Sequence, residues 1–195
     1  MLKPLRIIVA DDEPILTEAL EATLVDVGHQ VIAKAGTGEE LVQFAQDLLP
    51  DLIITDIKMP GIDGLEAAQR ICKEKPIPVI VTSAYHDEEF IERALNQNVM
   101  SYLVKPVELE SLTVAIKLAM RRFNEFEVLL KENSDLRQTL SDRKIIERAK
   151  GVLMKRAQID EEQAFLRLQK LAREKSERMV DTANAILTAD QALKD

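Results

Sequence analysis

Five short apolar runs alternate with amphipathic stretches over the first 107 residues, and this alternation leaves few folds open to the chain. The runs cover residues 5–10, 30–35, 51–56, 78–83 and 101–105. They lack the polar alternation of a half-exposed strand, so each is expected to be buried on both faces of a sheet. The stretches between them have apolar residues at helical spacing, which predicts helical crossovers between parallel strands. The sequence therefore predicts an α/β domain with a five-stranded, doubly wound parallel sheet.

One long helix is predicted after Pro106, where the strand patterns end. No proline and a single glycine, Gly151, occur between Leu109 and about Lys155. Apolar residues recur there at the spacing of a coiled-coil seam. The seam consists of Leu112, Ile116, Ala119, Phe123 and Phe126 and, after a skip, Leu129, Asn133, Leu136 and Leu140. A polar residue such as Asn133 on a seam favours a dimer of fixed register. The alternative is a single helix that packs on its own domain.

Two further helices are predicted to form a three-helix bundle with the end of the long helix. Asp160 and Gln163 have the spacing of a capping box, and Ser176 is expected to cap the last helix. Ala149 and Gly151 are small, so another helix is expected to approach the end of the long helix closely at these positions. The remaining core is predicted to contain Ile146, Val152 or Leu153, Ala164, Phe165, Leu168, Leu171, Met179, Ala183 and Ile186 or Leu187. The tail from Thr188 is expected to fray.

The charge is distributed unevenly between the two parts of the chain. Residues 1–120 have 10 Lys and Arg against 20 Asp and Glu, whereas residues 121–195 have 16 against 14. The segment 137–178 contains 12 basic and 7 acidic side chains, which is compatible with a polyanionic partner. No apolar run is long enough to span a membrane, and no cleavable leader is recognisable, so a cytoplasmic protein is expected. The single cysteine, Cys72, is expected to be a buried thiol.

Polar residues stand at the predicted carboxyl ends of four strands. Strand 5–10 is followed by Asp11 and Asp12, and strand 51–56 ends in Asp56. Strand 78–83 ends in Thr82 and Ser83, and strand 101–105 ends in Lys105. Parallel strands bring these ends to one edge, where three carboxylates would repel one another unless a cation neutralised them. Carboxylate oxygens suit Mg²⁺, and a lysine and a hydroxyl suit the oxygens of a phosphoryl group. Asp56 is therefore predicted to be a nucleophile that accepts phosphate.

These residues resemble those of a response-regulator receiver domain over residues 1 to about 125. The resemblance rests on Asp11-Asp12, the stretch DIKMPGIDG from Asp56, Ser83-Ala84 and Lys105-Pro106. It implies a flavodoxin-like fold with strand order 2-1-3-4-5 and phosphorylation of Asp56 by a sensor histidine kinase. It also implies Mg²⁺ bound by Asp11, Asp12, Asp56 and the backbone carbonyl of Lys58. Such a protein is not an enzyme apart from its own phosphorylation and autodephosphorylation.

The same resemblance implies a set of residues that respond to the phosphoryl group. Ser83 would contact that group after switching, and Lys105 would pair with it. Tyr102 would rotate inward when Ser83 moves. Thr82 is adjacent to Ser83, so an assignment one residue away remains open; Ala84, which follows Ser83, favours Ser83.

Residues 136 to about 190 resemble the ANTAR domain, an RNA-binding three-helix module. The resemblance rests on the sequence AKGVLM, followed by Asp160 and then EQAFLRLQKLA. It implies a regulator that binds paired hairpins in a nascent leader transcript and prevents a terminator from forming. Single-stranded bases are read by stacking, and phosphates are neutralised by Lys and Arg. Phe165 is interpreted as a core residue, so basic side chains must make most RNA contacts. The candidates are Arg143, Lys144, Arg148, Lys150, Lys155, Arg156, Arg167 and Arg173.

The predicted organisation is a receiver domain at 1–122, a coiled-coil linker at 123–140 and an ANTAR domain at 141–190. A homodimer is expected, and phosphorylation is expected to promote it. One alternative is a DNA-binding regulator, but the helix after the turn begins with the acidic sequence DEEQ, which would face DNA phosphates unfavourably. A second alternative is a receiver whose coiled coil docks a protein partner.

Overall fold

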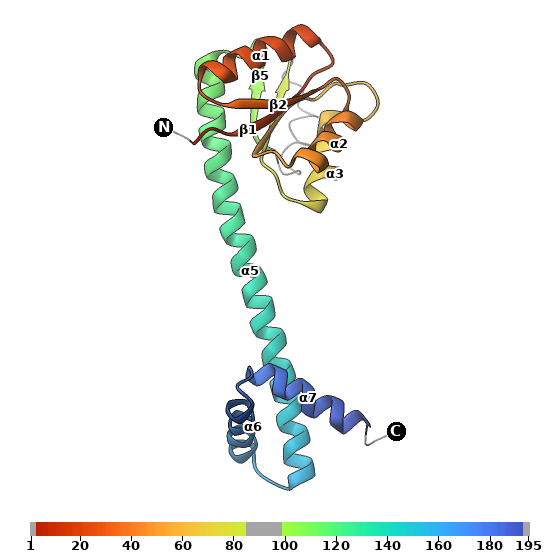
Figure 1. Cartoon of the computed structure of the whole chain (residues 1–195), viewed down its shortest axis with the longest axis vertical. Helices are drawn as coiled ribbons and strands as arrows, with labels where there is room; N and C mark the ends of the chain where they lie inside the picture. The colour runs from red at the N-terminus through yellow and green to blue at the C-terminus, as the bar shows by residue number, and fades with distance from the viewer. Residues whose placement is uncertain (1–2, 85–98, 193–195) are drawn as a thin grey trace. The chain divides into compact units, whose positions relative to one another are not determined.

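The computed structural model describes residues 3–84 and 99–192. Five parallel strands form one sheet, in the order β2-β1-β3-β4-β5 (Figure 1). They are β1 Arg6–Ala10, β2 Gln30–Ala35, β3 Leu52–Asp56, β4 Val79–Ser83 and β5 Val99–Val104. Strands β3 and β4 are buried along their whole length because they lie in the middle of the sheet. The predicted sheet and its strand order are confirmed.

Helices cover both faces of this sheet. On one face, α2 Gly38–Leu48 and α3 Gly64–Glu74 pack on a core that contains Ile8 and Ile53. On the other face, α1 Pro14–Asp26 and the first turns of α5 pack on Ile7 and Ile54. Strand residues alternate between these two cores, as the pleat of a strand requires. Cys72 is buried in the α2/α3 core, as predicted. The apolar spacing of residues 87–98 predicts one further helix between the last two strands, and this segment lies outside the described residues.

Helix α5 spans Leu109–Ala157, which confirms the long helix. Its first turns are buried in the core of the sheet domain, where Leu112, Ile116 and Ala119 are at most 1% exposed. The first half of the predicted seam therefore packs on its own domain, as in the alternative to a coiled coil. Farther along, Leu129, Leu136 and Leu140 are each at least 60% exposed, so only this second half of the seam is available to another chain.

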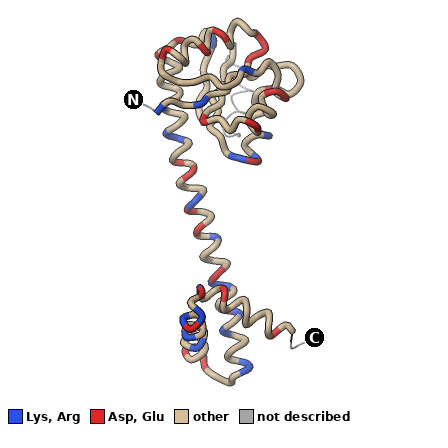
Figure 2. The backbone as a smooth tube through the Cα atoms, viewed as in Figure 1, with Lys and Arg blue, Asp and Glu red and all other residues tan. Residues whose placement is uncertain are grey.

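The chain divides into two compact units, Met1–Glu127 and Val128–Asp195. In the second unit, the end of α5 packs with α6 Glu161–Lys175 and α7 Met179–Ala192. Ala149, Leu168 and Ala183 form a fully buried centre, one from each helix. Asp160 and Gln163 form the predicted capping box at the start of α6. Figure 2 shows blue Lys and Arg along the later part of α5 and along α6.

The start and the end of α7 differ from the prediction. Ser176 caps the carboxyl end of α6 in the left-handed conformation, with φ of 54°. The α7 helix begins after Arg178, whose carbonyl oxygen accepts the first helical hydrogen bonds. The tail is not frayed through Ala192, because Asp190 is buried and pairs with Arg156. A contact with a residue 34 positions away in the sequence thus extends the helix.

Two predictions about packing in the bundle are wrong. Phe165 is 39% exposed and is not a core residue, because the α6 face that packs inward carries Ala164, Leu168 and Ala172. Gly151 does not admit a closely packed helix, since a Cβ built there meets nothing within 4 Å. A glycine in a helix costs about 1 kcal/mol relative to alanine, and close packing does not account for this cost at Gly151.

Candidate functional site

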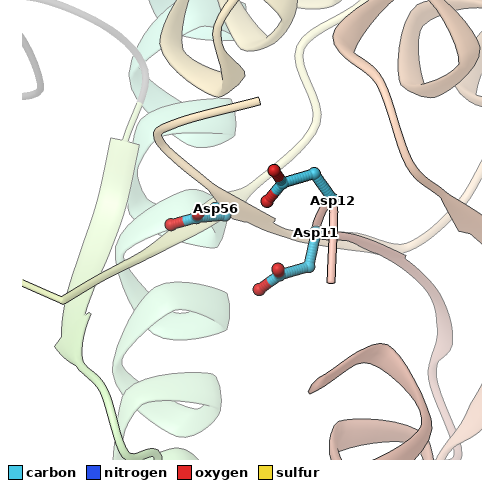
Figure 3. A group of neighbouring side chains, drawn as sticks. All are labelled: Asp11, Asp12 and Asp56. Atoms are coloured by element: carbon cyan, nitrogen blue, oxygen red, sulfur yellow. The ribbon is translucent and has the colours of Figure 1, made fainter. Parts of the chain in front are cut away.

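Three carboxylates gather where β1 and β3 end, as Figure 3 shows. Asp11 and Asp12 follow β1, and Asp56 is the last residue of β3. One oxygen from each side chain lies within 4.8 Å of the others. Asp11 and Asp56 are buried, whereas Asp12 is exposed. The pairing of β1 with β3 in parallel register brings these residues together, so the site follows directly from the sheet topology.

Lys105 joins this cluster from the end of β5. Its Nζ lies 2.6 Å from Oδ2 of Asp11 and 3.2 Å from Oδ2 of Asp56. The other oxygen of Asp56, Oδ1, accepts a hydrogen bond of 2.9 Å from the backbone N–H of Ile57. The lysine side chain is 18% exposed, so both ion pairs are largely shielded from solvent. One ammonium group therefore neutralises only part of the charge of three carboxylates.

The electrostatics of Asp56 and Lys105 are coupled. Burial raises the pKa of the Asp56 carboxyl group, because it disfavours the charged form, and the charge and hydrogen bond of Lys105 offset this only in part. Burial acts to lower the pKa of Lys105, but its hydrogen bond to Asp11 and the charges of Asp56 and Asp11 outweigh burial and raise that pKa. The lysine thus stays charged and favours an ionised, nucleophilic Asp56.

The donor set of this cluster fits Mg²⁺. Hard carboxylate oxygens from separate strand ends converge here, and Mg²⁺ prefers oxygen ligands with several positions left to water or phosphate. Lys58 lies two residues beyond Asp56 in the loop after β3, which is where a backbone carbonyl ligand is predicted. Its role as a ligand stays a prediction.

The predicted switch residues lie on β4 and β5, on the side of β3 away from β1. Ser83 is the buried last residue of β4, and Thr82 is also buried and pairs in register with Asp56. Thr82 lines a small cavity beside Asp11 and Lys105. Tyr102, on β5, is half-buried against the α2/α3 core. These positions fit a role for one hydroxyl and for Tyr102, and the choice of Ser83 stays a prediction.

The loop after Asp56 is held by contacts that the sequence did not indicate. The Glu39 carboxylate at the start of α2 accepts a hydrogen bond of 3.2 Å from the backbone N–H of Ile62. The Asp63 carboxylate caps α3 by accepting from the N–H of Glu66. Gly64 follows at once, and a Cβ there would overlap the carbonyl oxygen of Asp56. The turn therefore needs glycine at this position to keep Asp56 in place.

Replacing Gly64 with alanine is expected to destabilise the receiver unit by about 1–3 kcal/mol, the usual cost of overpacking. The added methyl group must displace the backbone of Asp56, so phosphorylation by a small phosphodonor should slow as well. Urea unfolding measures the first effect and phosphoprotein gels the second. Gly36→Ala is the matched control, because a Cβ at Gly36 meets only Glu40 at 3.8 Å. Equal stability of the two variants would contradict this account of the turn.

The predicted basic candidates are all in the second unit, but they differ in accessibility. Arg156 is half-exposed and pairs with Asp190 at 2.8 Å. Lys150 is buried, and its ammonium group is bound by Glu147 at 2.9 Å and Glu161 at 2.8 Å. Hydrogen bonds to Glu161 and Glu147 raise the pKa of Lys150. Its placement counts against direct contact with RNA and favours a role in joining α5 to α6. The exposed candidates are Arg143, Lys144, Arg148, Lys155, Arg167 and Arg173.

Fold and site together define a response regulator, and the comparisons place the chain in that family. The response regulator receiver domain matches residues 7–117, and the ANTAR domain matches residues 134–187. The chain therefore belongs to the response regulators that join a receiver domain to an ANTAR domain. The transcriptional regulatory protein PdtaR of Mycobacterium tuberculosis (strain H37Rv) is similar along nearly all of its length. It is 36% identical over 192 residues, which cover 98% of this chain and 94% of that protein.

Other relatives match only part of this chain. The positive alginate biosynthesis regulatory protein of Pseudomonas aeruginosa is 37% identical over 119 residues, which cover 60% of this chain and 48% of that protein. Among solved structures, the receiver domain of a modulated diguanylate cyclase from Desulfovibrio desulfuricans G20 has a TM-score of 0.58 at 30% identity, over 62% of this chain and 96% of that one. The response regulator domain of Thermotoga maritima CheB has a TM-score of 0.52 at 30% identity, over 61% and 93%. These likenesses confirm the receiver fold.

Within residues 3–84 and 99–192, no helix combines the length and the apolar character needed to cross a lipid bilayer.

Proposed function

We propose that a sensor histidine kinase phosphorylates Asp56, and that this promotes dimerisation and binding of hairpins in nascent RNA, so that a transcription terminator does not form. The observation that carries the proposal is the position of Asp56, at a strand end beside Lys105 and two further carboxylates. The matched ANTAR domain supplies the output. The protein then acts in the cytoplasm, where nascent transcripts are.

The chemical step is a transfer between two side chains. An oxygen of Asp56 attacks the phosphorus atom of a phosphohistidine, a new O–P bond forms, and the P–N bond breaks. The imidazole leaves with the electron pair and takes up a proton. Bound Mg²⁺ would neutralise charge on the phosphoryl oxygens, and Asp11 and Asp12 would hold it with Asp56 and the Lys58 carbonyl. Lys105, already 3.2 Å from Asp56, stabilises the charge that accumulates on the transferred group.

Phosphorylation then shifts a conformational equilibrium. The Ser83 hydroxyl moves to donate a hydrogen bond to the new phosphoryl group, Lys105 pairs with it, and Tyr102 rotates into the space that Ser83 leaves. The phosphoryl group need supply only the difference in free energy between two existing conformational states. Autodephosphorylation by water returns Asp56 to its starting form.

The second half of the α5 seam is the proposed contact between two copies of the chain. Leu129, Leu136 and Leu140 are exposed in one chain, and Asn133 lies among them on the same stripe. A parallel pair of helices would bury this stripe, and Asn133 opposite its copy would fix the register. Two ANTAR units joined in this way can hold two hairpins at once, which raises the overall affinity.

RNA is favoured over DNA by the charge pattern. The exposed basic residues of α5 and α6 offer several cations for phosphates. The start of α6, which a DNA reader would insert into the major groove, carries exposed Glu161 and Glu162. These carboxylates would face the phosphates and base edges of a duplex.

The test is binding of the purified full chain to a labelled two-hairpin RNA and to a DNA duplex of matched length. Each is measured with and without Mg²⁺ and acetyl phosphate. We expect tight RNA binding that the phosphodonor strengthens, with Asp56→Ala lacking the response. Omission of Mg²⁺ should remove the response in the wild type as well. Equal affinity for RNA and DNA in both states would exclude the antitermination output and favour a coiled coil that docks a protein partner.

A further inference from the structure

A cavity of about 580 Å³ lies between the last turns of α5 and the end of α7. Its lining includes Arg148, Gly151, Lys155 and Arg156 from α5, and Leu187 and Asp190 from α7. All belong to the second unit. The hollow opens to solvent, since Gly151 and Lys155 in its lining are exposed, and its volume is several times that of a water molecule.

Gly151 is the unusual residue in this wall. It occupies a regular helical position, where glycine is unfavourable relative to alanine. A Cβ at this position would meet no protein atom within 4 Å and would point into open space. Glycine is therefore not needed for packing or for the backbone conformation. What the missing side chain does provide is room for a ligand to reach the α5 backbone.

The rest of the lining combines apolar, cationic and acidic side chains. Val152 and Leu187 are half-buried and offer apolar surface. Arg148 and Lys155 are exposed at the edge. Arg156 is fixed in place by the buried carboxylate of Asp190, at 2.8 Å. A ligand that matches this mixed lining has a flat body with polar edges and a negative charge beside it.

We propose that this cavity receives one unstacked base from the loop of an RNA hairpin. The base lies over Gly151 between Val152 and Leu187, and Arg148 and Lys155 contact the phosphates on either side of it. The planar guanidinium of Arg156, held by Asp190, supplies a face or an edge to the base. This inference rests on the proposed RNA-binding function and adds to it the place where a base is read.

A loop base suits the site better than a duplex does. Sequence-specific RNA recognition relies on single-stranded bases that splay out and stack on side chains, including Arg planes. A duplex presents phosphates and groove edges, and it has no isolated base to insert into a cavity. The open Gly151 wall would serve no purpose for a duplex, because contacts to phosphates need only the exposed cations.

The first experiment fills the cavity by adding a side chain at Gly151. The probe is a labelled RNA hairpin with a loop selected from a randomised pool by the phosphorylated wild-type protein. We expect Gly151→Leu to weaken binding of this RNA about 10- to 100-fold, the range for loss of one stacked base. Gly151→Ala should weaken it less and should raise the thermal midpoint, because alanine favours the helix. Ala185→Leu, at an exposed α7 position outside the lining, should bind like wild type.

The second experiment removes the base from the RNA and leaves the cavity of the protein unchanged. Abasic nucleotides are placed one at a time in the selected loop. At one loop position, the abasic nucleotide should weaken binding by the wild type as much as Gly151→Leu weakens binding of the intact RNA. Gly151→Leu should bind this abasic RNA only slightly more weakly than it binds the intact RNA. A merely structural effect of the leucine would give additive losses at every position.

The outcomes separate this inference from the proposed function. If wild type binds the hairpin and both Gly151 variants bind equally well, the base-binding cavity is wrong and RNA binding stands. Additive losses would overturn the cavity in the same way. If the wild type selects no RNA from the pool, the proposed function fails and the inference fails with it. Should Gly151→Leu lose its helical circular dichroism, Gly151→Ala with the abasic series decides alone.

Discussion

Asp56→Ala is expected to abolish phosphodonor-stimulated dimerisation while the receiver domain stays folded. The substitution removes the proposed acceptor oxygen, and Asp11 and Asp12 come from the loop after a different strand and cannot take its place in line. Lys105 keeps its 2.6 Å contact with Asp11, so no buried ammonium is left unpaired. Because burial raises the pKa of Asp56, removing this carboxylate should cost no stability at neutral pH. Sedimentation velocity with and without acetyl phosphate and Mg²⁺ measures the result.

Asp47→Ala is a suitable control, since Asp47 is an exposed aspartate on α2 outside the acidic cluster. It should dimerise with the donor as the wild type does. Donor-stimulated dimerisation of Asp56→Ala would show that another residue accepts the phosphate or that the donor acts without phosphorylation. In either case the assignment of Asp56 as the acceptor would be wrong.

Much of the receiver site was predictable from sequence because it depends on topology alone. Once residues 51–56 are assigned to a buried parallel strand, Asp56 must lie at the same sheet edge as Asp11 and Lys105. Lys105 follows β5, the edge strand, and its ion pairs of 2.6 and 3.2 Å reach past β4 to Asp11 and Asp56 at this sheet edge. The role of Glu39 was not predictable in this way, because its contact joins the start of α2 to Ile62, 23 residues away in a loop.

The bundle was predicted less well because its details depend on contacts between distant residues. Ser176 has the chemistry of a helix cap, but the chain turns there with positive φ and so ends one helix before the next begins. Phe165 is apolar, but the smaller Ala164 and Ala172 allow close helix packing and occupy the inward face. No local signal shows that Asp190 would pair with Arg156 and extend α7.

The seam of α5 shows a different limit of sequence reasoning. Its spacing is the same on both sides of the skip at Phe126, yet Leu112 is buried by the sheet and Leu129 is 63% exposed. Apolar periodicity identifies which face of a helix becomes buried, but not what buries it. The exposed part, from Leu129 to Leu140, is about two heptads, which is short for an independent coiled coil. Such a contact is suited to a dimer that forms only when the receivers also favour it.

A double substitution on this exposed stripe, Leu129→Lys with Leu136→Lys, is expected to abolish the dimer. It should also lower affinity for a two-hairpin RNA by at least about 100-fold, because binding of the second hairpin is no longer intramolecular. Both leucines are more than 60% exposed in the single chain, so neither unit should lose stability. Binding to a single hairpin should stay the same. Sedimentation and RNA titrations at fixed salt measure these effects.

Val128→Lys with Ser134→Lys is the matched control, because it adds the same charge at exposed positions beside the stripe. It should dimerise normally and bind two-hairpin RNA at least as well as wild type, since added lysines favour RNA phosphates. Loss of affinity for single and double hairpins alike in the stripe variant would mean that the leucines support the ANTAR fold instead. Full retention of two-hairpin affinity would mean that the receivers alone join the two chains, and that this stripe serves another partner.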